Sequence, residues 1–155
     1  MTQQIEDNKN RIQKLFKTID ESLASGDYTK LDEFYTPDSA TRTHPRSTYQ
    51  APETAAEKKD TRAERHAQLD AARASFGERK HAVVMQIAEG DFVMSYLDVT
   101  LKHTGVFAGI TPTGKTIREK QIFIHRLTNG RVVETWSEGN ILGIFRQLGM
   151  IPLGA

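Results

Sequence analysis

The sequence predicts an α+β domain in which N-terminal helices are followed by an antiparallel sheet. Apolar residues recur with helical spacing near the N-terminus, whereas two hairpin patterns rich in β-branched and aromatic residues follow Gly77. No helical pattern separates the predicted strands, and a parallel sheet would need helices as connections. The length of 155 residues suits one domain, covering residues 1–155.

The first predicted helix buries one face. Its apolar positions have the spacing of a single helical stripe: Ile12, Leu15, Phe16, Ile19 and Leu23. Ser25-Gly26-Asp27 supplies a stop signal and the next N-cap, so we expect a short second helix over residues 28–35, which ends before Pro37.

A loop and a third helix are expected next. Residues 37–52 contain three prolines among threonines and serines, which favours an irregular loop. Residues 53–76 are rich in alanine, lysine, glutamate and arginine, which favours a helix. This helix should be mostly exposed, because few of its positions are suited to packing: Ala63, Ala67, Leu69, Ala71 and Phe76.

Two β-hairpins complete the predicted fold. Residues 81–88 and 92–103 form the first pair of strands, joined by a turn at Glu89-Gly90-Asp91. Residues 117–127 and 131–138 form the second pair. Asn129-Gly130 joins them and is a strong two-residue turn signal, because both positions tolerate positive φ.

Composition and charge exclude several classes of function. The formal net charge is +1, so no broad field would recruit nucleic acid or an anionic membrane. The absence of cysteine excludes disulfides and thiolate metal sites. The N-terminus is polar and acidic, unlike a signal peptide, and no window reaches membrane-spanning length. We therefore expect a cytoplasmic protein whose partners are small molecules or proteins.

The segment from Gly105 to Gly149 carries the most specific signal in the chain. It reads GVFAGITPTGKT, then a predicted strand, then NGRVVETWSEGNILGIFRQLG. This sequence resembles the SnoaL-like polyketide cyclases, a branch of the NTF2-like cone fold. The resemblance implies a strongly curved mixed or antiparallel sheet that packs against N-terminal helices and encloses a pocket. It also implies aldol-type acid/base chemistry on a hydrophobic, carbonyl-bearing small molecule, without metal or cofactor.

The same resemblance points to particular residues. In the family, an acidic residue four positions after the tryptophan of an E-x-W segment acts as acid and base; here that position is Asn140. An amide cannot transfer a proton in this way, but it can donate a hydrogen bond to a carbonyl or an enolate. His103, in the segment LKHTG, would lie in the pocket or stabilise the end of its strand. His44 lies on a loop that helps to close the pocket in the family, where it would touch ligand or be solvated.

The Asn129-Gly130 turn predicts the register of the second hairpin. A two-residue turn pairs Thr128 with Arg131, and the pairs that follow are His125 with Glu134, Phe123 with Trp136, Gln121 with Glu138, and Glu119 with Asn140. These residues share one face of the sheet, and their mixture of aromatic and polar groups is typical of a ligand pocket. Alternatively, this face is a wet surface or a dimer interface with Trp136 as its anchor.

The predicted site follows from this register. Glu138 is the expected acid/base, because Trp136 and Phe123 would shield its carboxyl from water. Asn140 and His103 complete the expected catalytic set. The substrate would lie against a further set of side chains: Gln121, Phe123, Trp136, His44 and Glu119. Glu138 could instead be an exposed glutamate at a strand end.

Neither a metal site nor a nucleotide site is expected. No two histidines share helical or strand spacing with a carboxylate in a way that builds a three-ligand face. GITPTGKT matches the letters of a phosphate-binding loop, but an alternating β-branched segment follows its lysine where a helix is required.

The sequence therefore favours a cofactor-independent cyclase or isomerase that forms a homodimer. One alternative is a non-catalytic protein that binds a small molecule. Another is an assembly module that pairs through its sheet.

Overall fold

The computed structural model describes residues 2–42 and 62–151. Helix α1 (Thr2–Ser25) is followed by the 3₁₀ helix η1 (Thr29–Phe34) and strand β1 (Tyr35–Arg42). Helix α2 (Arg62–Ser75) precedes the strands β2 (Phe76–Glu89), β3 (Phe92–His103), β4 (Thr116–Thr128) and β5 (Arg131–Gly139), and helix α3 (Ile141–Leu148) follows them. The strands form one sheet with the order β1-β5-β4-β3-β2, in which only β1 and β5 are parallel. This mixed α+β arrangement confirms the predicted fold class.

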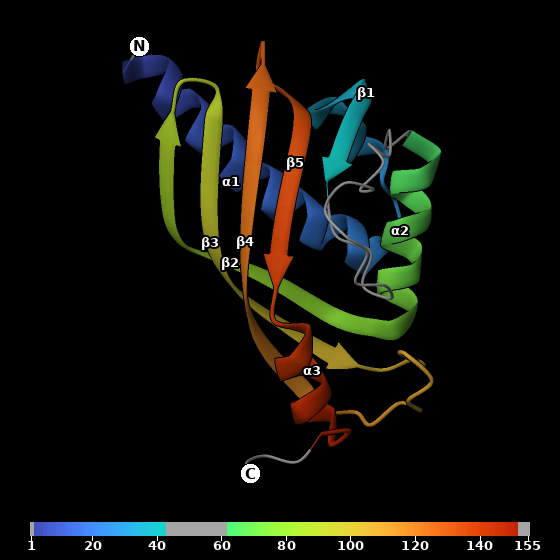
Figure 1. The fold of residues 1–155 in the computed structure, drawn as a ribbon. Coiled ribbons are helices and arrows are strands. Elements are labelled where there is room, and N and C mark those ends of the chain that lie inside the picture. Colours follow the sequence, from blue (N-terminus) through green and yellow to red (C-terminus); the bar gives the residue numbers. More distant parts are fainter. Residues whose placement is uncertain (1, 43–61, 152–155) are drawn as a thin grey trace, which may run out of the picture.

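Figure 1 shows α1 crossing one face of the bent sheet, with α2 beside β1 and α3 at the end of β5. We call the face that contacts α1 the inner face. The stripe predicted for the first helix is buried against it, since Ile12, Leu15 and Phe16 are at most 2% exposed. Side chains of β3 alternate as a strand requires, with Leu97 and Val99 buried inward. Each buried aliphatic or aromatic side chain contributes about 1.5–3 kcal/mol of transfer free energy.

The opposite, outer face of the sheet carries exposed apolar side chains. Four of them lie near one another by strand register, and we call them the outer patch: Met85, Ile87, Phe92 and Ile122. They are 39–56% exposed. Trp136 lies on the same face, with its ring centroid 6.1 Å from that of Phe92.

The predictions for the segments before β2 agree with the structure only in part. Part of the expected loop forms β1, which accommodates Pro37 because an edge strand need not donate every backbone hydrogen bond. The short second helix expected over residues 28–35 is present as the 3₁₀ helix η1. The third begins at Arg62, and residues 53–61, where we expected its first turns, lie outside the described residues. Helix α3 was not predicted.

The second hairpin has the predicted turn and a different register beyond it. Asn129 and Gly130 have φ of 50° and 72°, and Thr128 pairs with Arg131 as expected. Val132 then pairs with Leu127 but Glu134 pairs with Arg126, so Val133 is an extra, unpaired residue. Such a bulge moves every later side chain of β5 to the other face.

The predicted pairs beyond the bulge are therefore wrong. Phe123 is opposite Ser137 rather than Trp136, and Gln121 is opposite Gly139 rather than Glu138. His125 is opposite Thr135 rather than Glu134, and the ladder ends before any pairing of Glu119 with Asn140.

Candidate functional site

A cavity of about 710 Å³ lies between the helices and the inner face of the sheet. Its apolar walls include four phenylalanines and three isoleucines: Phe16, Phe76, Phe107, Phe123, Ile19, Ile141 and Ile144. Its charged, imidazole and amide side chains come from α2, β2, β4 and β5: Arg65, Gln68, Arg79, His81, Glu119, Gln121 and Glu138. This combination of apolar walls and a few polar groups is typical of small-molecule sites. We call it the inner cavity.

Strand β4 supplies three of the predicted pocket residues to the inner cavity. Glu119, Gln121 and Phe123 alternate along β4 and share its inner face. Glu119 and Gln121 are 8% and 6% exposed, and Nε2 of Gln121 donates a hydrogen bond to Oε1 of Glu119. Gly139 faces them across β5, and a Cβ at that position would lie 3.4 Å from Oε2 of Glu119. The glycine therefore leaves the space in front of the carboxylate open.

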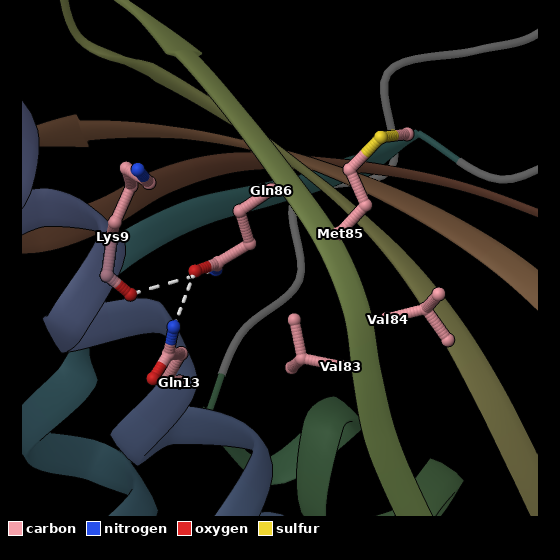
Figure 2. Close-up of a pocket in the computed structure, with 6 residues that line it drawn as sticks. All are labelled: Lys9, Gln13, Val83, Val84, Met85 and Gln86. Carbon is pink, nitrogen blue, oxygen red and sulfur yellow. Dashed lines mark hydrogen bonds between the residues drawn. The ribbon is translucent and has the colours of Figure 1, made fainter.

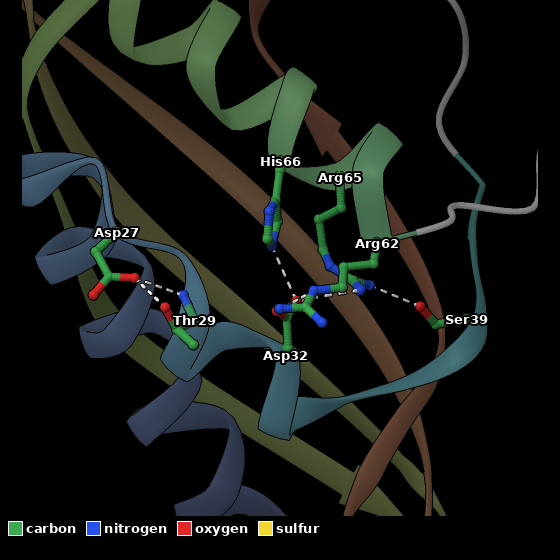
Figure 3. Close-up of polar contacts among 7 residues, drawn as sticks. All are labelled: Asp27, Thr29, Asp32, Ser39, Arg62, Arg65 and His66. Atoms are coloured by element: carbon green, nitrogen blue, oxygen red, sulfur yellow. Dashed lines mark hydrogen bonds and ion pairs between the residues drawn. The ribbon is translucent and has the colours of Figure 1, made fainter.

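Helix α2 brings a buried arginine to the inner cavity. Nη1 of Arg65 donates to the hydroxyl of Ser39 at 2.9 Å, and its guanidinium lies 4.1 Å from the ring centre of Tyr35. Asp32 lies beside Arg65 and accepts a hydrogen bond from His66 at 3.0 Å, as Figure 3 shows. These contacts tie α2 to η1 and β1 and hold one wall of the inner cavity.

His81 reaches the inner cavity from β2. Its Nδ1 lies 2.6 Å from Oδ1 of Asp20 on α1, and its ring stacks on Phe16 with the centroids 5.7 Å apart. The sequence alone indicates no partner for this histidine.

Glu138 does not occupy the predicted position. It contributes to the rim of the inner cavity, but it is exposed and its register partner is Ile122 on the outer face. The bulge at Val133 therefore separates Glu138 from Gln121 and Phe123. The same shift places Trp136 on the outer face, away from the residues that line the cavity.

Asn140 caps a helix in the structure. Its Oδ1 accepts the backbone N–H of Gly143 at 2.8 Å, at the first turn of α3. Asparagine is a favoured N-cap residue because its side chain satisfies an otherwise unpaired N–H group. Asn140 does not belong to the described lining of the inner cavity.

His103 stabilises a loop, which was the second of the two roles considered for it. Its Nδ1 accepts the backbone N–H of Thr113 at 3.1 Å and contacts the hydroxyl of the same residue at 3.0 Å. The ring is fully buried against Phe76, outside the lining of the inner cavity. His44, the other predicted histidine, lies outside the described residues.

His125 is buried on the inner face between aromatic rings. Its ring stacks on Phe123 at 5.9 Å and meets Phe16 edge-on at 5.7 Å. Burial lowers the pKa of His125 from 6.5 to about 3, so the ring is neutral near neutral pH. Glu134, the predicted cross-strand partner of His125, instead pairs with Arg126, whose Nε lies 2.5 Å from Oε2 of the carboxylate.

A second, smaller hollow lies at the edge of the sheet. This groove of about 340 Å³ lies between α1 and β2. Gln13 donates a hydrogen bond of 2.8 Å to Gln86 across it, and Figure 2 shows both side chains. Of the described residues that line it, only Lys9 is ionisable. The inner cavity is therefore the better candidate for chemistry.

The described residues contain no group of three histidine, aspartate or glutamate side chains that could hold a metal ion. Within the same part of the chain, no helix is both long and apolar enough to cross a membrane.

Sequence reasoning missed several residues of the inner cavity. Arg65 lies four positions before Leu69, a predicted packing residue, so the helical stripe could have included it. Arg79 lies two positions before His81, and extending the strand by one alternation would have placed both on one face. Nothing in the sequence indicated that Asp20 would meet His81, because that contact depends on the path of α1 across the sheet.

Known proteins share this fold and sequence pattern. The family model of SnoaL-like polyketide cyclases matches residues 13–148. The structure of IdmH, a candidate polyketide cyclase from Streptomyces antibioticus, is 25% identical over 92% of this chain and 98% of its own, with a TM-score of 0.74. A candidate SnoaL-like polyketide cyclase from Jannaschia sp. CCS1 is 21% identical over 95% and 94%, with a TM-score of 0.75.

A third structure carries a different assignment. AclR, a candidate hydroxylase from Streptomyces galilaeus, is 21% identical over 95% of this chain and 85% of its own, with a TM-score of 0.72. At this identity the likeness concerns the fold. No curated protein sequence matches the chain.

Proposed function

Because this chain belongs to the SnoaL-like polyketide cyclase family, we propose that it is a cofactor-independent cyclase or isomerase. Its substrate would be a hydrophobic small molecule that bears a carbonyl group. The observation that carries this proposal is the buried Glu119–Gln121 pair, which faces a largely apolar cavity of about 710 Å³. A cavity of this size accommodates a small organic molecule.

Glu119 is the group that we assign to acid/base chemistry, in place of Glu138. A carboxyl group can give a proton to a substrate oxygen and take it back later in the reaction. The hydrogen bond from Gln121 fixes the orientation of the carboxyl. The cationic side chains of Arg65 and Arg79 line the same cavity, where they favour an enolate over its neutral parent.

A second candidate function is binding without catalysis. The observation that favours it is the role of Asn140, whose side chain caps α3 at the position where the family has its acid. In that case the inner cavity would sequester or sense a ligand.

An exchange experiment separates the two functions. The probe is 2-tetralone, a bicyclic ketone with acidic α-protons, incubated with the protein in D₂O and followed by proton NMR. We expect the protein to accelerate loss of the α-proton signal, and Glu119→Gln to reduce the acceleration about 100-fold, the size of a typical acid/base contribution.

A matched pair of variants tests whether the reaction takes place in the inner cavity. Ala72 lines the cavity on α2, whereas Ala67 is an exposed residue of the same helix. Ala72→Trp should abolish binding and exchange, and Ala67→Trp should preserve both. Binding of 2-tetralone without exchange would refute the enzymatic proposal in favour of the binding function. No binding at all would contradict both.

We also propose that the protein forms a homodimer through the outer patch. Exposed apolar side chains on one face of a sheet are typical of an interface between subunits. Trp136, which lies beside this patch, would then anchor the interface.

A further inference from the structure

His81 combines two properties that the other described histidines do not combine. It lines the inner cavity, and it is hydrogen-bonded to a carboxylate. His66 also binds a carboxylate, that of Asp32, but it does not belong to the described lining of the cavity. Within the described part of the chain, His103 and His125 are buried and neither is hydrogen-bonded to a carboxylate.

Asp20 fixes His81 with both oxygens of its carboxylate. Oδ1 lies 2.6 Å from Nδ1 of the ring, and Oδ2 accepts the backbone N–H of the same histidine at 2.9 Å. Phe16, one helical turn before Asp20, stacks on the ring with an interplanar angle of 28°. The side chain of His81 is only 3% exposed. One edge and one face of the imidazole are therefore held by α1.

This arrangement selects one tautomer of the ring. An ionised carboxylate only accepts hydrogen bonds, so Nδ1 must carry the hydrogen that Asp20 binds. The neutral ring then has its lone pair on Nε2. Within the described residues, the structure records no hydrogen bond to Nε2, and this atom is not among the buried unpartnered ones. A neutral imidazole with a free Nε2 is a base that can accept a proton.

The strand register places His81 and Glu119 on either side of Val99. His81 pairs with Val99 of β3, and Val99 pairs with Glu119 of β4, so the three residues form one row across the inner face. Two strand spacings separate the Cα atoms of the outer two, about 10 Å. His81 and Glu119 both line the inner cavity, so a substrate there would have an imidazole on one side and a carboxyl group on the other.

We propose that His81, positioned by Asp20, is the base of the inner cavity and that Glu119 is its acid. This inference rests on the proposed function and divides the chemistry between two residues. Nε2 of His81 takes the α-proton of the substrate, and the electron pair of the broken C–H bond forms the enol as Glu119 protonates the carbonyl oxygen. Asp20 balances the charge of the imidazolium.

The remaining steps restore both groups. In an aldol closure, the enol carbon attacks a second carbonyl of the same substrate, and the new alkoxide takes the proton from Nε2 of His81. The enol oxygen returns its proton to Glu119 as the first carbonyl forms again. In an isomerisation, the proton on His81 goes instead to another carbon of the substrate.

The first test is spectroscopic and does not depend on turnover. Nitrogen-15 NMR of the imidazoles should show the Nδ1–H tautomer for His81 in the neutral form. His66 is the matched control, because Asp32 binds its Nε2 and the opposite tautomer is expected. Addition of 2-tetralone should shift the Nε2 resonance of His81 and leave that of His66 unchanged. An Nε2–H tautomer at His81, or no shift on binding, would overturn the assignment.

The second test is the pH profile of 2-tetralone exchange. A base accepts the α-proton only in its unprotonated form, so exchange by the wild type should fall at acidic pH. His81→Gln should lose about 100-fold in rate and should lack this acidic limb. Asp20→Asn should retain the limb at an intermediate rate, because the amide no longer enforces the tautomer. His66→Gln should behave as the wild type.

Other charged side chains of the inner cavity also contribute to the pH profile of exchange. These come from three elements besides β2 itself: Arg65 from α2, Glu119 from β4 and Glu138 at the rim on β5, together with Arg79 on β2. Full exchange and an intact acidic limb in His81→Gln would overturn this inference while leaving the proposed function in place. Absence of exchange in the wild type would overturn both.

Discussion

His125 should make the folded protein less stable in mild acid. In the folded state the pKa of His125 is lowered from 6.5 to about 3 by burial, whereas an unfolded chain keeps an imidazole pKa of about 6.5. Between these values the unfolded state binds one more proton, so the free energy of unfolding falls as the pH falls. The slope approaches about 1.4 kcal/mol per pH unit, and the loss from pH 7.5 to pH 5 is about 2 kcal/mol.

Urea unfolding followed by circular dichroism at pH 7.5 and pH 5 measures this effect. His125→Leu removes the titrating group and preserves an apolar side chain between Phe16 and Phe123. Since Nδ1 of His125 has no hydrogen-bond partner within the described residues, leucine breaks no bond to that atom. The wild type should lose about 2 kcal/mol more than the variant between the two pH values. His66→Gln controls for loss of a histidine elsewhere, and an equal loss in the wild type and His125→Leu would refute the reasoning.

Three further predictions concern packing, capping and assembly. A Cβ on Gly105 would lie 1.8 Å from the carbonyl oxygen of Ala74, so Gly105→Ala should lower the free energy of unfolding by more than about 2 kcal/mol in thermal or urea denaturation. Asn140→Ala should lower the free energy of unfolding by about 1 kcal/mol, because the backbone N–H of Gly143 loses its hydrogen-bond acceptor, and Asn140→Asp should keep the wild-type stability. Light scattering at micromolar concentration should report twice 17.4 kDa for the wild type, and Ile87→Asp in the outer patch should give the monomer.

Each of these has a clear contrary result. Wild-type stability in Gly105→Ala would mean that α2 and the loop after β3 are not in contact as described. Equal stability of the alanine and aspartate variants at position 140 would exclude the capping role. A wild-type protein of 17.4 kDa in solution would exclude the homodimer at that concentration.

The strands and their turns could be predicted from local sequence because local residues determine them. The Asn129-Gly130 turn adopts the positive φ angles that its residues tolerate, and both hairpins form where alternation indicated them. The apolar stripe of α1 likewise predicts which face of the helix is buried. Strand β1 has no such signal, since its stability comes from pairing with β5, nearly a hundred positions later in the chain.

The site was harder to predict because it depends on one irregularity and on tertiary contacts. Glu119, Gln121 and Phe123 share the inner face as predicted, because the bulge lies in β5 and leaves the alternation of β4 unchanged. Val133 carries no glycine or proline signal that would mark a bulge. The contact between Asp20 and His81 joins residues 61 positions apart, and no local pattern reports it.

The bulge at Val133 also determines how much empty space the protein encloses. After it, the short side chains of Thr135 and Ser137 point inward and the indole of Trp136 points outward. In a regular ladder the large indole would have taken up much of the inner cavity. The size of the inner cavity therefore depends on the number of residues in β5. Loss of one residue would move every later side chain of β5 to the opposite face of the sheet, whereas a substitution changes a single side chain. Single-residue insertions and deletions in this hairpin offer such a chain a short evolutionary route between an open chamber and a filled core.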